Sequence, residues 1–300
     1  MHRMSIRAGA AGITVDLARR LVAAQFPEWA DLPLILVAEW GNVNAMYRLG
    51  DGMVVRLPRV EWGLDGLERE LRWLPWLAPR LSTPVPEVIG IGEPGEGFPW
   101  RWCIFRWLEG RNPVVNPLEA PLALADDLAS FIGSLHALDP QGGPPSDQSL
   151  ALHDKAVREA NDALRGIIDA PAVTRTWDAC LEADEWAGMP VWLHGDLTPG
   201  NILVTGGRLS AVIDFSGTGI GDPAGDLRVA WNLLPRSARE RFRRSFAFDD
   251  ATWSRAKGKA LAQAVNHLRF YRESNPVLGR NAREVIREIA EDRETAGRPP

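Results

Sequence analysis

The sequence predicts an α+β chain of two lobes: a small N-terminal lobe built on an antiparallel sheet and a larger, mainly helical C-terminal lobe. Short β-prone runs crowd residues 34–58, separated by a Gly- and Asn-rich connection and by the pair Asp51-Gly52. This pattern is typical of strands joined by hairpins. After residue 107 the apolar residues recur at helical spacing over long stretches. We therefore expect lobes of residues 1–106 and 107–300.

The N-terminal lobe is expected to begin with a helix over residues 14–30, for which Thr14 is a suitable N-cap. Three antiparallel strands should follow, at 34–40, 45–50 and 53–58.

A second helix is indicated by apolar residues at helical spacing, namely Leu64, Leu67, Leu71, Leu74 and Leu77. Residues 85–94 and 100–110 complete the lobe as two further strands, and the chain passes to the second lobe near 105–110.

The C-terminal lobe should contain a helix over residues 121–138 and a mainly helical stretch at 154–188, interrupted by Pro171. Short strands are expected within 191–215, and helical periodicity returns over roughly the last 75 residues.

Composition excludes several classes of protein. The 300 residues are 45% hydrophobic and 24% charged, which suits a globular chain. Two distant cysteines, Cys103 and Cys180, argue against a disulfide framework or a zinc site. Neither a signal peptide nor an apolar run of membrane-spanning length is evident, so we expect a cytoplasmic protein.

The net charge of −5 argues against a nucleic-acid partner, and we expect no membrane partner either. The charge is uneven: residues 107–235 carry 18 acidic and 7 basic groups, whereas residues 236–300 carry 9 acidic and 15 basic groups. An acidic region would attract a metal or a cationic substrate, although solvated helix faces give the same pattern.

The segment VWLHGDLTPGNILV at 191–204 carries the strongest chemical signal. Asp196 and Asn201 lie five residues apart between two apolar runs, and Asp214 follows in AVIDF. If the strands around them pair as a hairpin, residues thirteen apart come close in space. Carboxylate and amide oxygens suit Mg²⁺, and a nearby carboxylate can orient a hydroxyl nucleophile, as phosphoryl transfer requires.

HGDLTPGNILV together with VIDFSGTGIGDPAGDL resembles the aminoglycoside phosphotransferase family, a branch of the protein-kinase-like fold. The resemblance implies that Asp196 is the catalytic base or the group that orients the acceptor, and that Asn201 and Asp214 hold Mg²⁺. It further implies that His194 supports the loop and that Asp226 hydrogen-bonds it. Asp222, before Pro223, is either part of this signature or a turn residue.

The same resemblance implies a nucleotide site in the N-terminal lobe. A turn containing Gly41, Asn42 and Asn44 would direct backbone N–H groups at phosphate, although it lacks a GxGxxG pattern. Arg56 stands where the family usually has a lysine that binds the phosphates, and the two side chains are not equivalent. Glu70 is expected to anchor this cation. Glu68 is the alternative, and only one of the two can face the strand.

The segment CIFRWLEG is expected to connect the lobes and to hydrogen-bond a purine through its backbone near Arg106, Trp107 and Leu108. Trp107 is equally well explained as a core residue. Side chains do not decide between ATP and GTP.

The resulting functional expectation is a Mg²⁺-dependent phosphotransferase that moves the γ-phosphate of ATP or GTP to a hydroxyl of a small molecule. An aminoglycoside-type or other antibiotic is the first choice of acceptor; a macrolide or a metabolite is an alternative. A catalytically inactive nucleotide-binding module is a further alternative, suggested by Arg56. A protein acceptor is disfavoured, because only seven residues separate Asp214 from Asp222. Monomer and homodimer stay open.

Overall fold

The computed structural model describes residues 13–37, 43–113, 118–146 and 149–296. The chain forms two compact units, which are described separately. The first unit comprises Met1–Gly110 and Ala211–Gly217, and the second comprises Arg111–Ser210 and Thr218–Pro300. The division into functional lobes at residues 106 and 107 stays a prediction.

The first unit is built on a five-stranded antiparallel sheet in the order β1-β2-β3-β5-β4. Its strands are β1 (Leu34–Leu36), β2 (Asn44–Leu49), β3 (Met53–Pro58), β4 (Val88–Gly92) and β5 (Trp102–Arg106). The Asp51-Gly52 turn joins β2 to β3, which pair from Leu49↔Met53 to Asn44↔Pro58. The expected strands of this lobe are therefore confirmed in kind and order.

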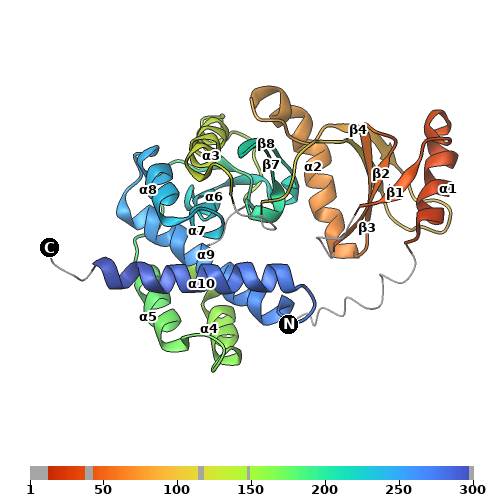
Figure 1. The fold of residues 1–300 in the computed structure, drawn as a ribbon. Coiled ribbons are helices and arrows are strands. Elements are labelled where there is room, and N and C mark those ends of the chain that lie inside the picture. The colour runs from red at the N-terminus through yellow and green to blue at the C-terminus, as the bar shows by residue number, and fades with distance from the viewer. Residues whose placement is uncertain (1–12, 38–42, 114–117, 147–148, 297–300) are drawn as a thin grey trace. The chain divides into compact units, whose positions relative to one another are not determined.

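Two helices cover this sheet, α1 (Val15–Gln25) on one face and α2 (Leu64–Leu77) on the other (Figure 1). Thr14 caps α1 as predicted, because its Oγ1 accepts a hydrogen bond from Leu17 N at 3.2 Å. The buried face of α1 packs into a core formed with the sheet, and α2 buries Leu67, Leu74 and Leu77.

Alternation along β3 decides which residues face each helix. Val55 and Leu57 belong to the core that α1 shares, together with Ile104 of the neighbouring strand β5. Because successive side chains of a strand point to opposite faces, Val54 and Arg56 face the other side, where α2 lies. Five of the six β3 residues are buried, as expected for a central strand covered on both faces. A buried arginine on this face therefore needs a partner on α2.

The second unit is mainly helical. Its helices are α3 (Pro121–His136), α4 (Asp154–Ala163), α5 (Ala170–Leu181), α6 (Ala224–Leu227), α7 (Val229–Asn232), α8 (Arg236–Arg244), α9 (Asp250–Tyr271) and α10 (Pro276–Ala296). Short 3-10 turns are also present: η2 (Pro27–Trp29), η3 (Glu61–Gly63), η4 (Ala78–Arg80), η5 (Leu150–His153), η6 (Pro199–Asn201) and η7 (Phe215–Gly217).

Pro171 lies in the first turn of α5, where proline is tolerated, so the predicted interruption is the start of a helix.

Two small strand pairs frame the HGD motif. The expected hairpin is present, formed by β7 (Ile202–Thr205) and β8 (Arg208–Val212). The strand before the motif, β6 (Val191–Leu193), pairs instead with β9 (Gly219–Gly221). Asp196 therefore lies in the connection from one strand pair to the other, and Asn201 immediately precedes β7.

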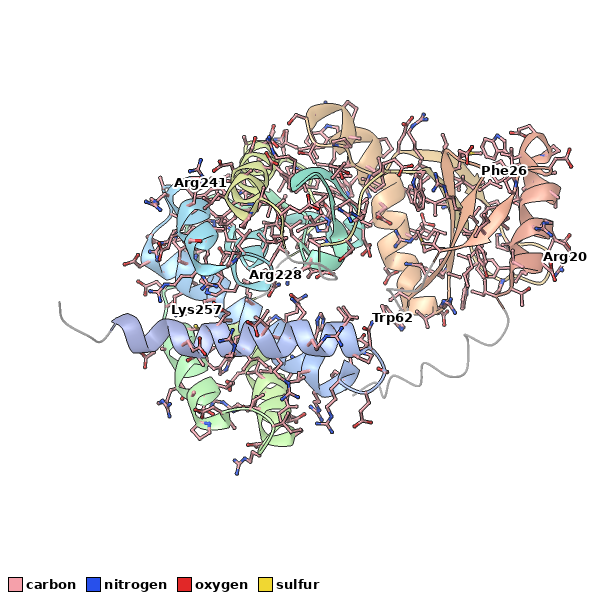
Figure 2. The ribbon with its side chains drawn as sticks, viewed as in Figure 1. Arg20, Phe26, Trp62, Arg228, Arg241 and Lys257 are labelled. Atoms are coloured by element: carbon pink, nitrogen blue, oxygen red, sulfur yellow. The ribbon has the colours of Figure 1, made fainter. Side chains whose placement is uncertain are left out.

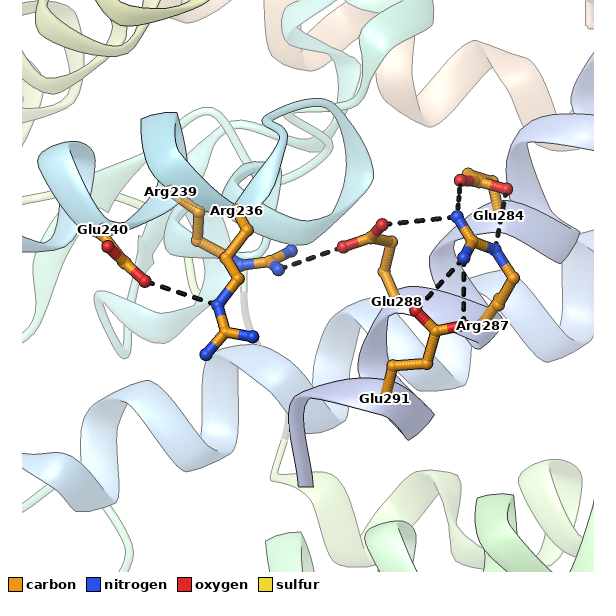
Figure 3. A network of polar contacts seen from close by, with 7 residues as sticks. All are labelled: Arg236, Arg239, Glu240, Glu284, Arg287, Glu288 and Glu291. Atoms are coloured by element: carbon orange, nitrogen blue, oxygen red, sulfur yellow. Dashed lines mark hydrogen bonds and ion pairs between the residues drawn. The ribbon is translucent and has the colours of Figure 1, made fainter. Parts of the chain in front are cut away.

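The C-terminal helices form the largest packed group of the second unit, with α10 lying along α9. Asp249 caps α9 by accepting a hydrogen bond from Thr252 N at 2.8 Å. An ion pair of 3.2 Å between Arg239 of α8 and Glu288 of α10 links two of these helices (Figure 3). In the part of the chain that the structure describes, no helix is long and apolar enough to cross a membrane.

Candidate active site

Asp226 of α6 accepts hydrogen bonds from the backbone of the HGD loop in the second unit. His194 N donates to Asp226 Oδ2 at 2.8 Å, and Gly195 N donates to Oδ1 at 3.1 Å. Gly195 has a φ of +84°, a conformation that favours glycine, and this turns both N–H groups toward one carboxylate. The expectation that Asp226 hydrogen-bonds the loop is confirmed.

Asp226 is fully buried and needs these donors to stay ionised. Burial raises its pKa, but His136, whose Nε2 lies 3.8 Å from Oδ2, and the backbone N–H of His194 outweigh burial. The net result is a pKa below the usual range of an aspartate. The loop is thus anchored to a buried negative charge.

His194 is also fully buried, and its Nδ1 accepts a hydrogen bond from Asp196 N at 3.2 Å. An imidazole nitrogen that accepts a hydrogen bond carries no proton. The side chain therefore shapes the backbone before Asp196, which agrees with the supporting position expected for it.

The Asp196 side chain is 47% exposed, yet donors surround it. Its Oδ1 accepts a hydrogen bond from Gln263 Nε2 of α9 at 3.1 Å and lies 3.4 Å from Arg228 Nη2. Arg228 (labelled in Figure 2) also donates to Gly195 O at 2.5 Å. Asn201 Nδ2 lies 3.4 Å from the other carboxylate oxygen, Oδ2. The Asp196 carboxylate is accessible to solvent, and these contacts fix its orientation.

The side chain of Asn201 hydrogen-bonds back to the loop that carries it. Its Nδ2 donates to Asp196 O at 2.8 Å, which fixes the amide at the end of η6. Both side-chain contacts of Asn201 use Nδ2, so Oδ1 is the side-chain atom that can face a cation.

The first unit brings together Asn44, Arg56, Glu70 and Asp214. Arg56 Nη1 lies 2.6 Å from Glu70 Oε2, and Nη2 lies 3.5 Å from Asp214 Oδ1. With its oxygen turned inward, the Asn44 amide accepts from Arg56 Nη2 and Nε at 3.1 and 3.0 Å. Burial lowers the pKa of Arg56, but Glu70 and Asp214 outweigh burial and raise it overall. Asn44 thus supports the cation with its side chain.

Glu70, not Glu68, is the carboxylate of α2 that contacts Arg56. Glu68 pairs instead with Arg101 at 2.8 Å, on the exposed side of the helix. The second oxygen of Glu70, Oε1, accepts a hydrogen bond from Phe215 N at 2.8 Å. Burial raises the pKa of Glu70 to about 7, although Arg56 and Phe215 N–H both favour its ionised form. Glu70 therefore ties the β3 cation to the segment after Asp214.

Asp214 has a φ of +64°, in the left-handed region that non-glycine residues rarely adopt. The segment that follows, η7, packs tightly against α2: a Cβ on Gly66 would lie 2.7 Å from Ser216 Cβ. Glu70 and Gly66 hold this segment from two positions on one helix. Strained backbone held by its surroundings is common at functional positions.

Two of the three backbone N–H groups expected to bind the purine already donate hydrogen bonds within the protein. Arg106 N donates to Glu87 O at 2.9 Å, and Trp107 N donates to Gly52 O at 2.8 Å. The Arg106 side chain is exposed and pairs with Glu87, while Arg48 lies 4.4 Å above the ring of half-buried Trp107. Of the three backbone N–H groups, Leu108 is the one not engaged in this way. Gly41 and Asn42 lie outside the described residues.

The described residues contain no cluster of three His, Cys, Asp or Glu side chains that could hold a metal ion by itself. When Mg²⁺ binds with a nucleotide, it takes one or two protein oxygens and completes its shell with phosphate and water. The amide of Asn201 and the carboxylate of Asp214, which is 38% exposed, are oxygen ligands of this kind.

Gln263 and Arg228 were missed by sequence reasoning. Gln263 lies 67 residues after Asp196, in a helix whose pattern carries no motif. Arg228 follows the GDPAGDL signature directly, and its charge beside that signature was the one usable signal.

Comparison with known proteins gives a family match over residues 35–261, to the family described as the phosphotransferase enzyme family (APH). An aminoglycoside 3'-phosphotransferase of Escherichia coli is 27% identical over 186 residues, covering 57% of this chain and 64% of that protein. A hygromycin-B 4-O-kinase of Escherichia coli is 23% identical over 225 residues, covering 70% of this chain and 64% of that protein. The chain thus spans just under two thirds of the length of these relatives.

Solved structures share the fold. A GDP and kanamycin complex of APH(2")-IIia aligns with a TM-score of 0.72 and 20% identity, covering 92% of this chain and 98% of that one. The macrolide 2'-phosphotransferase MphH of Brachybacterium faecium aligns with a TM-score of 0.61 and 24% identity, covering 91% and 97%. The small antiparallel-sheet unit and the helical unit are therefore those of a known kinase-like architecture.

Proposed function

Because the chain belongs to the phosphotransferase enzyme family, we propose that it transfers the γ-phosphate of a purine nucleoside triphosphate to a hydroxyl of a small molecule. The observation that carries this proposal is the Asp196 loop. An accessible carboxylate is fixed there by Gln263, and Asn201 is bound to its backbone. Phosphoryl transfer depends mainly on positioning and charge, and this loop supplies both.

Asp196 is the proposed catalytic base. Its exposed carboxylate can accept a hydrogen bond from an acceptor hydroxyl, orient the oxygen and take up its proton as the phosphorus–oxygen bond forms. The buried charge of Asp226 holds the loop backbone, so the carboxylate is positioned before any substrate binds.

Arg56 is the proposed cation for the nucleotide phosphates. Its contacts with Glu70, Asn44 and Asp214 use four of the five N–H donors of the guanidinium, so one N–H remains for a phosphate oxygen. A guanidinium binds phosphate well, which supports arginine in place of the family's usual lysine. The intact Arg56–Glu70 pair argues against an inactive nucleotide-binding module.

Asn201 and Asp214 are the proposed protein ligands of Mg²⁺, through Oδ1 of the amide and the carboxylate. When bound, the ion neutralises charge on the phosphate groups. The strained backbone of Asp214, held by the α2 contacts, supports a functional position for this residue.

The purine is proposed to meet the backbone at residues 106–108, with Leu108 N–H as the donor, because the N–H groups of Arg106 and Trp107 are already bound. The Gly41–Asn42 turn stays the proposed phosphate loop. Adenine and guanine present different hydrogen-bonding edges, so ATP and GTP are both to be tested.

The proposed acceptor is an aminoglycoside-type or other antibiotic, since the relatives named above are an aminoglycoside 3'-phosphotransferase and a hygromycin-B 4-O-kinase. A cytoplasmic location stays a prediction.

The test is a transfer screen. Purified protein is incubated with Mg²⁺, ATP or GTP, and a panel of aminoglycosides, macrolides and small hydroxylated metabolites, and products are identified by mass spectrometry. We expect a phosphorylated acceptor that requires both nucleotide and Mg²⁺. Failure to bind Mg-nucleotide or to transfer phosphate to any member would contradict the proposal.

A further inference from the structure

Gln263 of α9 contacts the proposed base, Asp196, and belongs to none of the recognised motifs. Its Nε2 donates to Asp196 Oδ1 at 3.1 Å, across 67 residues of sequence. The contact lies wholly within the second unit. A neutral donor can hold a carboxylate in place without the strong drop in basicity that a directly paired cation causes.

The Gln263 amide is held at both ends. Asn232, at the end of α7, is buried, and its Nδ2 donates to Gln263 Oε1 at 2.8 Å. Because a carboxylate oxygen can only accept, the Gln263 nitrogen must face Asp196, and the Gln263 oxygen then faces the donor on Asn232. Asn232 is itself held, since its backbone oxygen accepts from Asn281 Nδ2 of α10 at 3.2 Å. Hydrogen bonds thus run from α10 through α7 and α9 to the loop.

The two carboxylate oxygens of Asp196 consequently have different hydrogen-bonding partners. Oδ1 receives the Gln263 amide and lies 3.4 Å from Arg228 Nη2, whose short bond is to Gly195 O. Among the described residues, Oδ2 receives only the long 3.4 Å contact from Asn201. The oxygen with the weaker contact keeps more capacity to accept a hydrogen bond.

We propose that Gln263 is a positioning residue that occupies Oδ1 of Asp196 and thereby presents Oδ2 to the acceptor hydroxyl. This inference rests on the proposed function, since it assumes that Asp196 is the base. Removing the amide leaves the carboxylate free to rotate between orientations, only some of which are productive. The loss should fall on kcat, because the interaction orients the reacting group and makes no contact with the nucleotide.

The test compares Gln263→Met and Gln263→Glu with wild type on the acceptor found in the transfer screen. Gln263→Met keeps the length of the side chain and removes the donor, and kcat should fall about 10- to 100-fold. Gln263→Glu places a second carboxylate against Oδ1, so kcat should fall at least as far. Mg-nucleotide affinity should stay at the wild-type value in both variants.

Other ionisable groups lie near Asp196. His267, one turn along α9, is subject to the charges of Asp196 and Arg228, and burial lowers its pKa. His194 and Arg228 adjoin Asp196 in the loop and beside it. All three are unchanged in both Gln263 variants, so a difference in kcat reports on position 263.

Asn266→Ala is the matched control, because Asn266 is an amide on the same helix whose Nδ2, among the described residues, bonds only to Ala262 O. It should leave kcat within about twofold of wild type. Thermal melting and Mg-nucleotide affinity verify that each variant is folded.

Wild-type kcat in both Gln263 variants would overturn the inference while leaving the proposed function intact. Loss of nucleotide affinity together with kcat would also overturn it, because a positioning role does not predict that loss. Absence of transfer by the wild type would remove the function and this inference with it.

Discussion

At the scale of single residues, Asp196 and Asp214 are fixed by different means. The Asp196 side chain is held by donors, whereas Asp214 is defined by a backbone in the left-handed region. Neither difference is visible in the HGD or AVIDF motif. The motifs predict which residue types the chemistry needs, and the structure adds what holds each one.

Arg56 offers the first prediction. Arg56→Ala removes the cation and leaves Glu70 and Asp214 facing each other, so the nucleotide KM should rise about tenfold or more. Arg56→Lys keeps one charge but cannot serve Glu70, Asp214 and Asn44 together, so its KM should lie between those of wild type and Arg56→Ala. Steady-state kinetics with varied nucleotide decide this, and an unchanged KM in Arg56→Ala would show that Arg56 does not bind the phosphates.

Asp226 offers a prediction for stability. In Asp226→Asn the side chain keeps one oxygen acceptor for two backbone N–H donors, so the free energy of unfolding should fall by about 1–3 kcal/mol at pH 7. Asp162→Asn is the exposed control, expected to change it by less than about 0.5 kcal/mol. Denaturant unfolding measures both. Equal effects would contradict the anchoring of the loop.

The pH dependence follows from the lowered pKa of Asp226. A carboxylate whose folded-state pKa lies below its unfolded value stabilises the fold above the unfolded value of about 3.9. That contribution is lost as pH falls through the lower folded-state pKa. The stability gap between wild type and Asp226→Asn should therefore be full at neutral pH and shrink below about pH 4. A gap that widens on acidification would contradict this.

At the scale of elements, periodicity predicted most of the first unit. The Leu64–Leu77 spacing defines α2, and the alternation of β3 sends Arg56 toward it. The preference for Glu70 over Glu68 came from the resemblance to the family, whereas helix geometry showed only that one of the two can face the strand. The pairing of β6 with β9 could not be predicted, because β9 is three residues of Gly-Ile-Gly with no strand pattern.

Gly66 gives a prediction for α2. In an exposed helix, Gly→Ala usually stabilises by up to about 1 kcal/mol. At Gly66 the new Cβ would lie 2.7 Å from Ser216 Cβ, so Gly66→Ala should displace η7, lower stability and reduce turnover. Gly133→Ala in α3 meets nothing within 4 Å and should be neutral or stabilising. Melting temperatures and turnover of the pair test this; similar gains in both variants would contradict close packing at Gly66.

The α8–α10 ion pair gives a second prediction at this scale (Figure 3). Arg239 is buried and lies 3.2 Å from Glu288, so Glu288→Gln should cost about 1–2 kcal/mol of unfolding free energy. Glu240 pairs with Arg236 on the exposed side of α8, and Glu240→Gln should cost less than about 0.5 kcal/mol. Denaturant unfolding at low and high salt compares them. A larger loss for Glu240→Gln would contradict this.

At the scale of the whole molecule, the proposed catalytic parts are divided between the two units. Arg56, Glu70 and Asp214 belong to the first, and Asp196 and Asn201 belong to the second. The HGD and AVIDF motifs predicted Asp196, Asn201 and Asp214, and the family resemblance predicted Arg56 and Glu70. Gln263 and Asn232 escaped prediction because their significance comes only from packing of α7 and α9 against the loop, and amides in a helix carry no spacing signal.

The central claim is that Asp196 acts in the transfer step and not in binding the nucleotide. The most direct measurement is the single-turnover rate of phosphate transfer by Asp196→Asn, made alongside its affinity for Mg-nucleotide. We predict a rate at least about 100-fold below wild type, because general-base catalysis contributes about that much or more, with nucleotide affinity unchanged. Transfer at the wild-type rate by Asp196→Asn would contradict the claim.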